Sequence, residues 1–163
     1  RYYLVTGDVT SLERYYPVIR GCAEWMIHDA LIRDEQGRLT VRTMADIAEG
    51  VMASDNPIFA ACATIRCLHN AADAAAILKK DMKPALRWKN LADELFDNLP
   101  FDKNKGIFRY ADDVDIPTEM SHLAMVFPFS FDVAGKQAAK TMQAAWAVYQ
   151  QQKDDGTPEV VFS

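Results

Sequence analysis

The sequence has few cysteines, no cluster of basic residues and no uninterrupted apolar run long enough to cross a membrane. Its three cysteines have spacings that match neither a disulfide framework nor a zinc knuckle. The 18 basic residues are dispersed and outnumbered by 23 acidic ones, unlike the clustered lysines and arginines of a nucleic-acid groove. The longest alanine-rich stretch, 58–78, contains Arg66 and Asp73, which are costly in a bilayer. We therefore expect no nucleic-acid partner, no membrane span, no metal site and no cofactor.

What the chain does contain is an ordinary globular composition, half hydrophobic and one quarter charged. Its 163 residues suffice for one core, so residues 1–163 are expected to form a single domain. The chain starts at Arg1, without an initiator methionine or signal peptide, and residues 159–163 resemble an interrupted strand or loop. These ends predict an excised piece of a larger helical domain. The compartment stays open between a bacterial periplasmic or secreted location and the cytoplasm.

Four long segments have the apolar spacing of α-helices, at 10–33, 56–78, 82–98 and about 133–152. Thr10–Glu13 matches a capping box at the start of the first helix. Asn56 is the expected cap of the second helix, with Pro57 in its first turn, where a missing N–H costs nothing. This second segment is apolar nearly all round, which predicts an inner helix packed on several sides.

The last two helices each have an apolar face that predicts how they pack. On the third helix, the residues expected to face inward are Leu86, Leu91, Leu95 and Phe96. On the fourth, they are Ala138, Met142, Ala145, Trp146 and Tyr149. Short strands are expected at Leu39–Val41 and Gly106–Tyr110, and a short helix at Ser121–Val126. The predicted fold is all-α, built from antiparallel helical hairpins with short strands in the connecting loops.

The segment 42–56 carries three carboxylates just ahead of the inner helix: Asp46, Glu49 and Asp55. It is too apolar for a solvated loop, so we expect it to pack against other parts of the protein. Burial raises the pKa of a carboxylic acid, which a general acid acting near neutral pH requires. Glu49 is the first candidate for this acid and Asp46 the second. The residues alone favour a structural alternative, in which Asp46 and Asp55 cap helices and Glu49 points to water.

A second acidic segment has four acids within eight residues: Asp112, Asp113, Asp115 and Glu119. These carboxylates can supply a general base, bind a divalent cation or form an exposed acidic turn. Their spacing matches no calcium-binding loop, which argues against the cation. His122 follows, just before an apolar run, where a structural histidine is more common than a catalytic one.

Three segments, in the same order along the chain, resemble the catalytic domains of six-hairpin glycosidases, above all glycoside hydrolase families 65 and 95. Tyr2–Trp25, with its Tyr-Pro step and alanine–aromatic end, is similar to a hairpin helix of these enzymes. Glu49 stands six residues before Asp55–Asn56, the interval between the general acid and an Asp-Asn pair in family 65. Ser121–Leu123, followed by Phe127–Pro128, resembles the Ser-His-Leu and Tyr-Pro segment of family 95.

The resemblance implies an (α/α)6 toroid and an inverting reaction carried out by two carboxylates. Glu49 would be the general acid, and Asp115 or Glu119 the base that activates water. The two carboxyl groups of an inverting enzyme lie about 6.5–9.5 Å apart, which leaves room for that water. In the phosphorylase branch of these families, phosphate replaces water and no protein base is needed.

The resemblance also implies a carbohydrate substrate, with Asp46, His122 and Trp25 among its contacts. Trp25, Trp88 and Tyr110 can each offer an aromatic face to a sugar ring, although core packing is the more common role of such residues.

A six-hairpin toroid contains twelve helices, of which this chain accounts for less than half. The remainder of the barrel is expected from the same or another chain. An alternative of a different class is a helical-repeat scaffold that binds another protein. Repeat proteins have a fixed period, whereas these helices have unequal lengths, which argues against this alternative without excluding it. The sequence therefore predicts a fragment of a glycoside hydrolase catalytic domain, with a glycoside phosphorylase and the repeat scaffold as alternatives.

Overall fold

A computed structural model of the chain describes residues 2–47, 53–114, 128, 129, 131 and 135–154. The elements follow in the order α1 (Tyr2–Thr6), α2 (Val9–Trp25), a π-helical turn η1 (Met26–Ala30), β1 (Leu31–Arg33), β2 (Leu39–Val41), α3 (Ile58–Leu78), α4 (Met82–Asp97), β3 (Phe101–Asp102), β4 (Ile107–Phe108) and α5 (Gly135–Asp154). The strands form two antiparallel hairpins, β1–β2 and β3–β4. The prediction of a mainly α-helical chain with short strands in its loops is confirmed.

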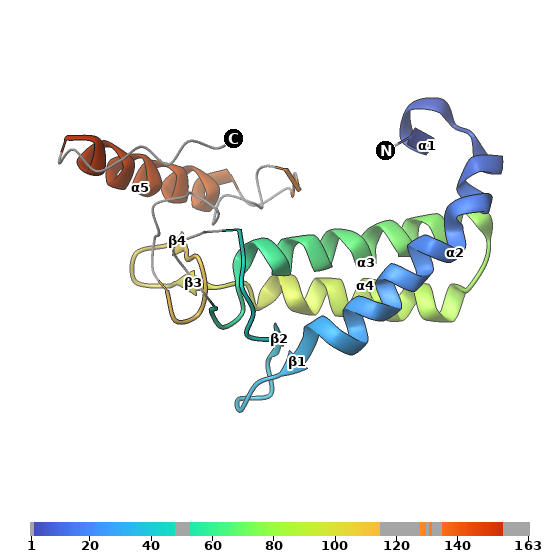
Figure 1. Cartoon of the computed structure of the whole chain (residues 1–163), viewed down its shortest axis with the longest axis horizontal. Helices are drawn as coiled ribbons and strands as arrows, with labels where there is room; N and C mark the ends of the chain where they lie inside the picture. Colours follow the sequence, from blue (N-terminus) through green and yellow to red (C-terminus); the bar gives the residue numbers. More distant parts are fainter. Residues whose placement is uncertain (1, 48–52, 115–127, 130, 132–134, 155–163) are drawn as a thin grey trace.

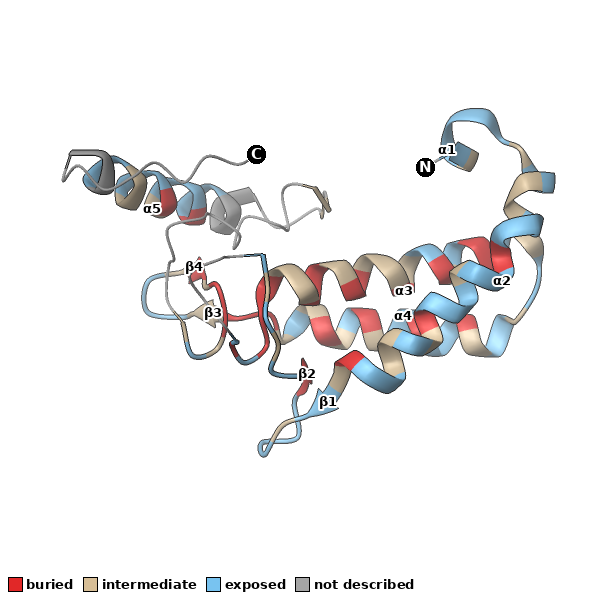
Figure 2. Cartoon of the chain, viewed as in Figure 1, coloured by how far each residue is buried: buried red, intermediate tan, exposed pale blue. Residues whose placement is uncertain are grey.

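Helix α3 is the inner helix of the described fold. Helix α4 lies antiparallel beside it and α2 crosses it (Figure 1). Nine residues distributed along its length are buried: Ile58, Ala61, Cys62, Thr64, Ile65, Leu68, Ala71, Ala74 and Ala75. Figure 2 shows this burial as red segments along α3. Burying each leucine or isoleucine contributes roughly 1.5–3 kcal/mol, so the predicted inner helix is the main source of core stability.

Helix α4 is amphipathic, and its inner face agrees with the predicted one except at Leu86. Trp88 and Leu95 are fully buried against the core, and Leu91 and Phe96 pack at its edge. Leu86 was expected to face inward and is instead 61% exposed. It precedes Trp88 by two residues, which places it about 200° around the helix from that buried side chain.

Asp8, rather than Thr10, caps the N-terminus of α2. The Asp8 carboxylate accepts the backbone N–H of Ser11 at 3.0 Å and the Ser11 hydroxyl at 2.7 Å. These bonds hold the pKa of Asp8 below its ordinary value, with the hydroxyl bond as the largest cause. The capping box at Thr10–Glu13 was therefore the wrong cap, because an aspartate two residues earlier reaches the same set of free N–H groups.

The first predicted helix also ends earlier than expected. Helix α2 contains Pro17 and ends at Trp25, and η1 follows it. Leu31–Arg33 then forms β1 instead of a last helical turn, and pairs with the predicted strand β2. Pairing with β2 gives the backbone of these residues cross-strand partners in place of helical ones.

Helix α5 covers β4 rather than the helical core. Of the α5 residues whose burial is described, Thr141 and Ala145 are buried, and the Thr141 hydroxyl accepts the backbone N–H of Phe108 at 2.9 Å. Met142 and Trp146, which were expected to face inward, are 48% and 53% exposed. The predicted face of this helix is therefore confirmed at Ala145 and wrong at Met142 and Trp146, because α5 contacts a strand through its small residues.

The remaining elements are confirmed in part. The predicted strand at 106–110 is limited to Ile107–Phe108, paired with β3. The predicted helix at 121–126 lies outside the described residues. Within the described part of the chain, no helix combines the length and the apolar character needed to span a membrane.

Candidate functional site

Four of the predicted site residues, Glu49, Asp115, Glu119 and His122, lie outside the described residues. The structure does describe the chain on both sides of them. The described residues nearest to Glu49 are 47 before it and 53 after it. The described residues nearest to the second segment are 114 before it and 128, 129 and 131 after it. These flanks show where the two acidic segments are attached.

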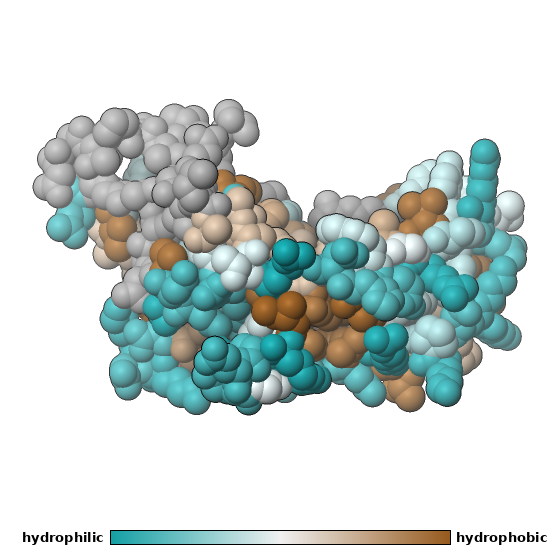
Figure 3. Space-filling model, turned by 60° about the horizontal axis from the view of Figure 1, so that its bottom comes forward, coloured by the Kyte–Doolittle hydropathy of each residue, from teal (hydrophilic) through white to brown (hydrophobic). Residues whose placement is uncertain are grey.

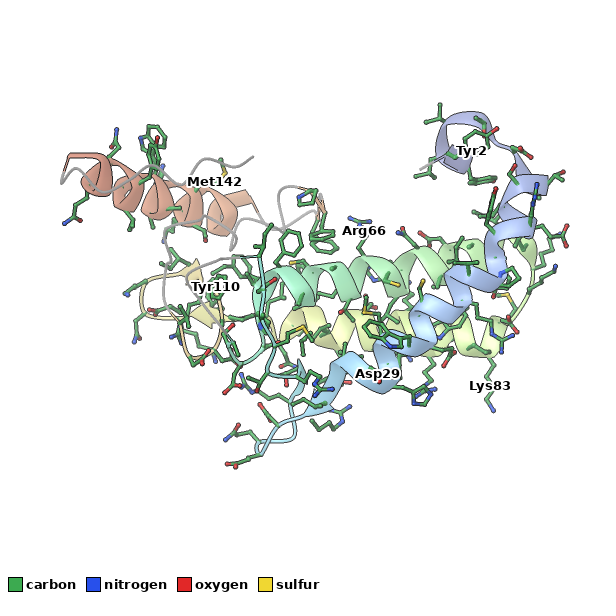
Figure 4. All side chains as sticks on the ribbon, in the orientation of Figure 1. Tyr2, Asp29, Arg66, Lys83, Tyr110 and Met142 are labelled. Carbon is green, nitrogen blue, oxygen red and sulfur yellow. The ribbon has the colours of Figure 1, made fainter. Side chains whose placement is uncertain are left out.

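The two acidic segments are joined at the N-terminal end of α3. The backbone N–H of Asp55 donates to the Asp113 carboxylate at 3.0 Å, and the N–H of Asp112 donates to the Asp55 carbonyl at 2.8 Å. The N–H of Ile58, the first residue of α3, donates to the Tyr110 carbonyl at 2.8 Å. Figure 4 shows Tyr110 beside this end of the helix. The loop predicted to carry the acid is thus hydrogen-bonded directly to the loop predicted to carry the base.

The first acidic loop is closed at its base. Met44 and Ser54 form an antiparallel bridge through two backbone hydrogen bonds of 3.1 and 3.2 Å. Beside it, the Thr43 hydroxyl donates to the Asp55 carboxylate. Glu49 belongs to the stretch between the two bridged residues, so both flanks of the candidate acid are fixed at one point.

The second acidic segment is anchored beyond its far end as well. Phe129 packs edge-on against Phe59 in the first turn of α3, with ring centroids 5.1 Å apart. Arg66, about two turns further along, donates to the Phe129 carbonyl and lies 4.7 Å from the centre of the Phe131 ring. The flanks on both sides of residues 115–127 are therefore attached at the N-terminal half of α3.

Asn56 holds this end together, although it does not cap α3 as predicted. Its side chain accepts the N–H of Val41 at 3.1 Å and donates to the Asn98 carbonyl at 3.0 Å and to the Asp112 carboxylate at 3.5 Å. It is 2% exposed and has a positive φ of 53°. Pro57 takes the cap position and offers no side-chain bond to the helix. Asn56 thus connects β2, the end of α4 and the second acidic segment.

Asp46 supplies the capping contact that Asn56 does not. Its carboxylate accepts the N–H of Phe59 at 3.2 Å. Burial raises the pKa of Asp46 above its ordinary value, while the N–H groups of Ile47, Ala60 and Phe59 act in the opposite direction. The capping role proposed for Asp46 as an alternative is confirmed, and its role in sugar binding stays a prediction. The raised pKa indicates that burial disfavours the charged form of the Asp46 carboxyl group.

Asp112 is a second carboxylate with a raised pKa at the same end. Burial is the largest cause, and the Arg38 guanidinium and the Asn56 amide partly oppose it. Arg38 donates to Asp112 at 3.0 Å and to Asp34 at 2.7 Å. The tip of the β1–β2 hairpin is thereby attached to the second acidic segment.

A cavity of about 600 Å³ opens next to Asp112, between the two β-hairpins and the C-terminal end of α4. It is lined by Arg38, Phe96, Asp97, Asn98, Leu99, Phe101, Lys103, Phe108, Arg109 and Asp112. Charged and amide groups are thus combined with three phenylalanine rings. Figure 3 shows mostly hydrophilic residues at this end of the forward face, whereas apolar residues gather nearer its middle.

The three aromatic candidates for sugar stacking divide into two groups. Trp88 and Tyr110 are fully buried, and the Trp88 indole donates to the Glu24 carboxylate at 3.0 Å. Both are therefore core residues, as their more common role suggests. Trp25, at the last position of α2, is 57% exposed and keeps an aromatic face open to a ligand.

Sequence reasoning missed Arg38, Asn98 and the cavity they line. The cavity is built from residues up to 74 positions apart in the chain, from Arg38 to Asp112, so no local pattern marks it. Asp112 itself belongs to the second acidic segment, and the composition of that segment marked it as a candidate site residue in the sequence. Among the described residues, no three histidine, cysteine, aspartate or glutamate side chains are placed to hold a metal ion.

Comparison with known proteins adds no functional information to this geometry. No protein-family model matches the chain, and no curated protein matches it. The functional argument therefore rests on the residues and contacts of the chain itself.

Proposed function

We propose that the chain belongs to the catalytic domain of an inverting glycoside hydrolase, with Glu49 as the general acid and Asp115 or Glu119 as the base. One observation carries the proposal: the two acid-bearing loops are hydrogen-bonded to each other at the N-terminal end of the inner helix. An inverting reaction needs two carboxylates facing each other across the scissile bond, and joined loops can supply one from each side.

The lengths of chain involved are compatible with that geometry. Asp115 is two residues beyond Asp113, so its Cα lies within about 7 Å of the Cα of that anchored residue. Glu49 belongs to the stretch closed by Met44 and Ser54, next to the same anchor. The chain lengths therefore permit a separation of about 6.5–9.5 Å between the carboxyl groups.

The electrostatic environment is suited to an acid. A general acid must be protonated when the glycosidic oxygen departs, so its pKa must be raised by desolvation or by nearby negative charge. Burial raises the pKa of Asp46 and of Asp112, which flank the candidate acid and base. A carboxyl group of Glu49 in the same surroundings would be protonated closer to neutral pH.

The helical arrangement supports the barrel part of the proposal. An inner helix, α3, is followed by an antiparallel amphipathic helix, α4, and the acidic loops lie at one end of the inner helix. In our proposal this pair is one hairpin of an (α/α)6 toroid, and further hairpins from the same or another chain complete the sugar site. The substrate is a carbohydrate, in the cytoplasm or in a bacterial periplasmic or secreted setting.

The test is the hydrolysis of oligosaccharides and aryl glycosides by the full-length protein that contains this chain. Glu49→Gln should lower the rate by about 10²–10⁴-fold on substrates with poor leaving groups. Its effect should be much smaller with a dinitrophenyl leaving group, which needs no proton. Asp115→Asn or Glu119→Gln, whichever removes the base, should lower the rate on both kinds of substrate.

Glu35→Gln is the matched control, because Glu35 is an exposed glutamate in the β1–β2 turn. NMR of the first product should show the inverted anomer. Wild-type rates in Glu49→Gln, or the same loss in Glu35→Gln, would contradict the proposal. Phosphate dependence with release of a sugar 1-phosphate would assign the phosphorylase branch instead.

A further inference from the structure

More cations than carboxylates line the cavity between the two hairpins, in a chain that is negative overall. Among the described residues, three cations, Arg38, Lys103 and Arg109, line it together with two carboxylates, Asp97 and Asp112, a balance of +1. The whole chain has a net charge of −5. Burial raises the pKa of Asp112, which weakens the negative contribution further as the pH falls. Asp34, outside the lining, pairs with Arg38 and brings this balance to zero, so an anionic group that enters the cavity meets less net negative charge than the chain carries as a whole.

Arg38 is already held in place for such a group. Its Nε donates to Asp34 at 2.7 Å and its Nη2 to Asp112 at 3.0 Å, which fixes the plane of the guanidinium. A guanidinium has five N–H donors, and these two bonds use two of them. A fixed guanidinium loses little freedom when it pairs with a carboxylate, and the planar shapes of the two groups match.

The rest of the lining is suited to a sugar ring rather than to a small inorganic anion. A volume of about 600 Å³ is within the usual range for an organic ligand and much larger than a phosphate ion needs. Phe101 and Phe108 meet edge to face, with centroids 5.1 Å apart, and can pack against the apolar face of a ring. Asp97 and Asn98 add groups that hydrogen-bond to hydroxyls.

From this combination of cations, hydroxyl-binding groups and aromatic rings, we infer that the cavity binds a sugar residue that carries a carboxylate. The substrate of the proposed reaction is then an acidic glycoside, in which Arg38, Lys103 and Arg109 recognise the anionic residue. This inference rests on the proposed function for its connection to catalysis, but the binding itself does not depend on turnover.

Two ligands that differ in one group test the inference: methyl β-D-glucuronide, with a carboxylate, and methyl β-D-glucoside, with a hydroxymethyl group. In NMR titrations of the full-length protein at pH 7, the glucuronide should bind at least about tenfold more tightly, and added salt should reduce this difference. Lys103→Gln should weaken glucuronide binding about fivefold and leave glucoside binding unchanged. Lys103 is exposed, so the substitution should not disturb folding.

Lys83→Gln is the matched control. Lys83 is also exposed, but it lies in the first turn of α4, at the opposite end of that helix from the cavity (Figure 4). Equal binding of the two sugars, no measurable binding of the glucuronide, or unchanged glucuronide binding in Lys103→Gln would overturn the inference. Displacement of the glucuronide by an equal concentration of inorganic phosphate would also overturn it, because the site would then select a free anion.

The same titration separates this inference from the proposed function. Glu49→Gln should bind the glucuronide with wild-type affinity, because in our proposal Glu49 acts on the glycosidic bond and the cations of the cavity bind the carboxylate. If the protein binds the glucuronide but Glu49→Gln hydrolyses glycosides normally, the assignment of the acid fails and the cavity inference stands. If Glu49→Gln is inactive and the two sugars bind equally, the cavity inference fails and the assignment of the acid stands.

Discussion

The two ends of α3 each adjoin a residue with a φ of 53°, Asn56 before the helix and Lys79 after it, but the two residues are held in different ways. Asn56 is buried, and its side chain bonds to three other segments. Lys79 is exposed and ends the helix through its own backbone N–H, which bonds to Ala75 and Ala76. The same backbone conformation is thus fixed by tertiary contacts at one end and by local helix termination at the other.

This difference indicates where the fold places its buried polar groups. A buried polar group is costly unless it is paired, so a structure that contains several of them at one place has extensive hydrogen bonding there. At the N-terminal end of α3, Asn56 is buried, and Asp46 and Asp112 have pKa values raised by burial. The C-terminal end is a short turn into α4, near which one such group, the Tyr16 hydroxyl, bonds to Asp81. The N-terminal end, where the acidic loops meet, is therefore the end we assign to function.

The largest effect is expected for Asn56→Ala. The substitution removes the acceptor of the Val41 N–H and the donor to the Asn98 carbonyl, and it places a Cβ-bearing residue without polar compensation at a positive φ. Lost hydrogen bonds in a buried site and left-handed strain together should lower the free energy of unfolding by about 3 kcal/mol. Urea denaturation measures this change.

Asn70→Ala is the control for this prediction, because Asn70 is an exposed asparagine on α3 itself. Its effect should stay within about 0.5 kcal/mol. Asn56→Gly relieves the backbone strain but not the lost bonds, so it should recover only part of the stability. If Asn56→Gly were as stable as the wild type, the only role of Asn56 would be to adopt the positive φ of the turn. The hydrogen bonds of its side chain would then not stabilise this end of α3.

A smaller loss is expected at Asp46, together with a change in pH dependence. Asp46→Ala removes the acceptor of the Phe59 N–H and should cost about 1 kcal/mol, as the loss of a helix cap does. The pKa of Asp46 is raised in the folded state, so the unfolded chain releases this proton first as the pH rises. The contribution of Asp46 to stability should therefore fall as the pH increases above its ordinary pKa of 3.8.

Asp46→Asn isolates the charge, since its amide oxygen can still accept the Phe59 N–H. Denaturation of this variant at a series of pH values should lack the decline that the wild type shows. Asp73→Asn, an exposed site on the same helix, should leave that decline in place. A decline of the same size in Asp46→Asn and the wild type would contradict the assigned burial of Asp46.

The helices could be predicted from the sequence because their periodicity is local. The predicted ranges 56–78 and 82–98 differ from α3 and α4 by no more than two residues at any end. The choice of cap was not predictable in the same way. Asn56 has the right chemistry and position for a cap, but the fold uses its amide to join three segments and leaves capping to Asp46, twelve positions before the start of α3.

The predicted faces were wrong at single residues, where packing is decided by partners distant in the sequence. Trp146 was assigned to the core from its spacing, whereas α5 rests on β4 through Thr141 and Ala145. The acidic loops could be recognised from their composition, but their junction depends on backbone bonds between Asp55 and residues 112–113. No local pattern contains that information, and the same is true of the cavity.

Tyr16 provides a tertiary contact near the C-terminal end of α3. Its hydroxyl donates to the Asp81 carboxylate at 2.9 Å, and burial followed by this bond raises the pKa of Tyr16 to about 12. Tyr16→Phe should lower the free energy of unfolding by about 1 kcal/mol at pH 7. The folded wild type should also lose stability as the pH rises from 10 toward 12, because the unfolded chain ionises first, and the variant should lack this loss. Tyr15→Phe, at an exposed neighbour, should change neither quantity.

The smallest effect is expected at Lys79, and it has the opposite sign. Glycine adopts a positive φ without steric cost, and no side-chain bond of Lys79 holds the turn within the described part of the chain. Lys79→Gly should therefore raise the free energy of unfolding by about 0.5–1 kcal/mol. Lys80→Gly should destabilise the protein, because it removes the ion pair with Glu13 at 2.6 Å. A loss of stability in Lys79→Gly would mean that side-chain contacts fix this end of α3 as they fix the other.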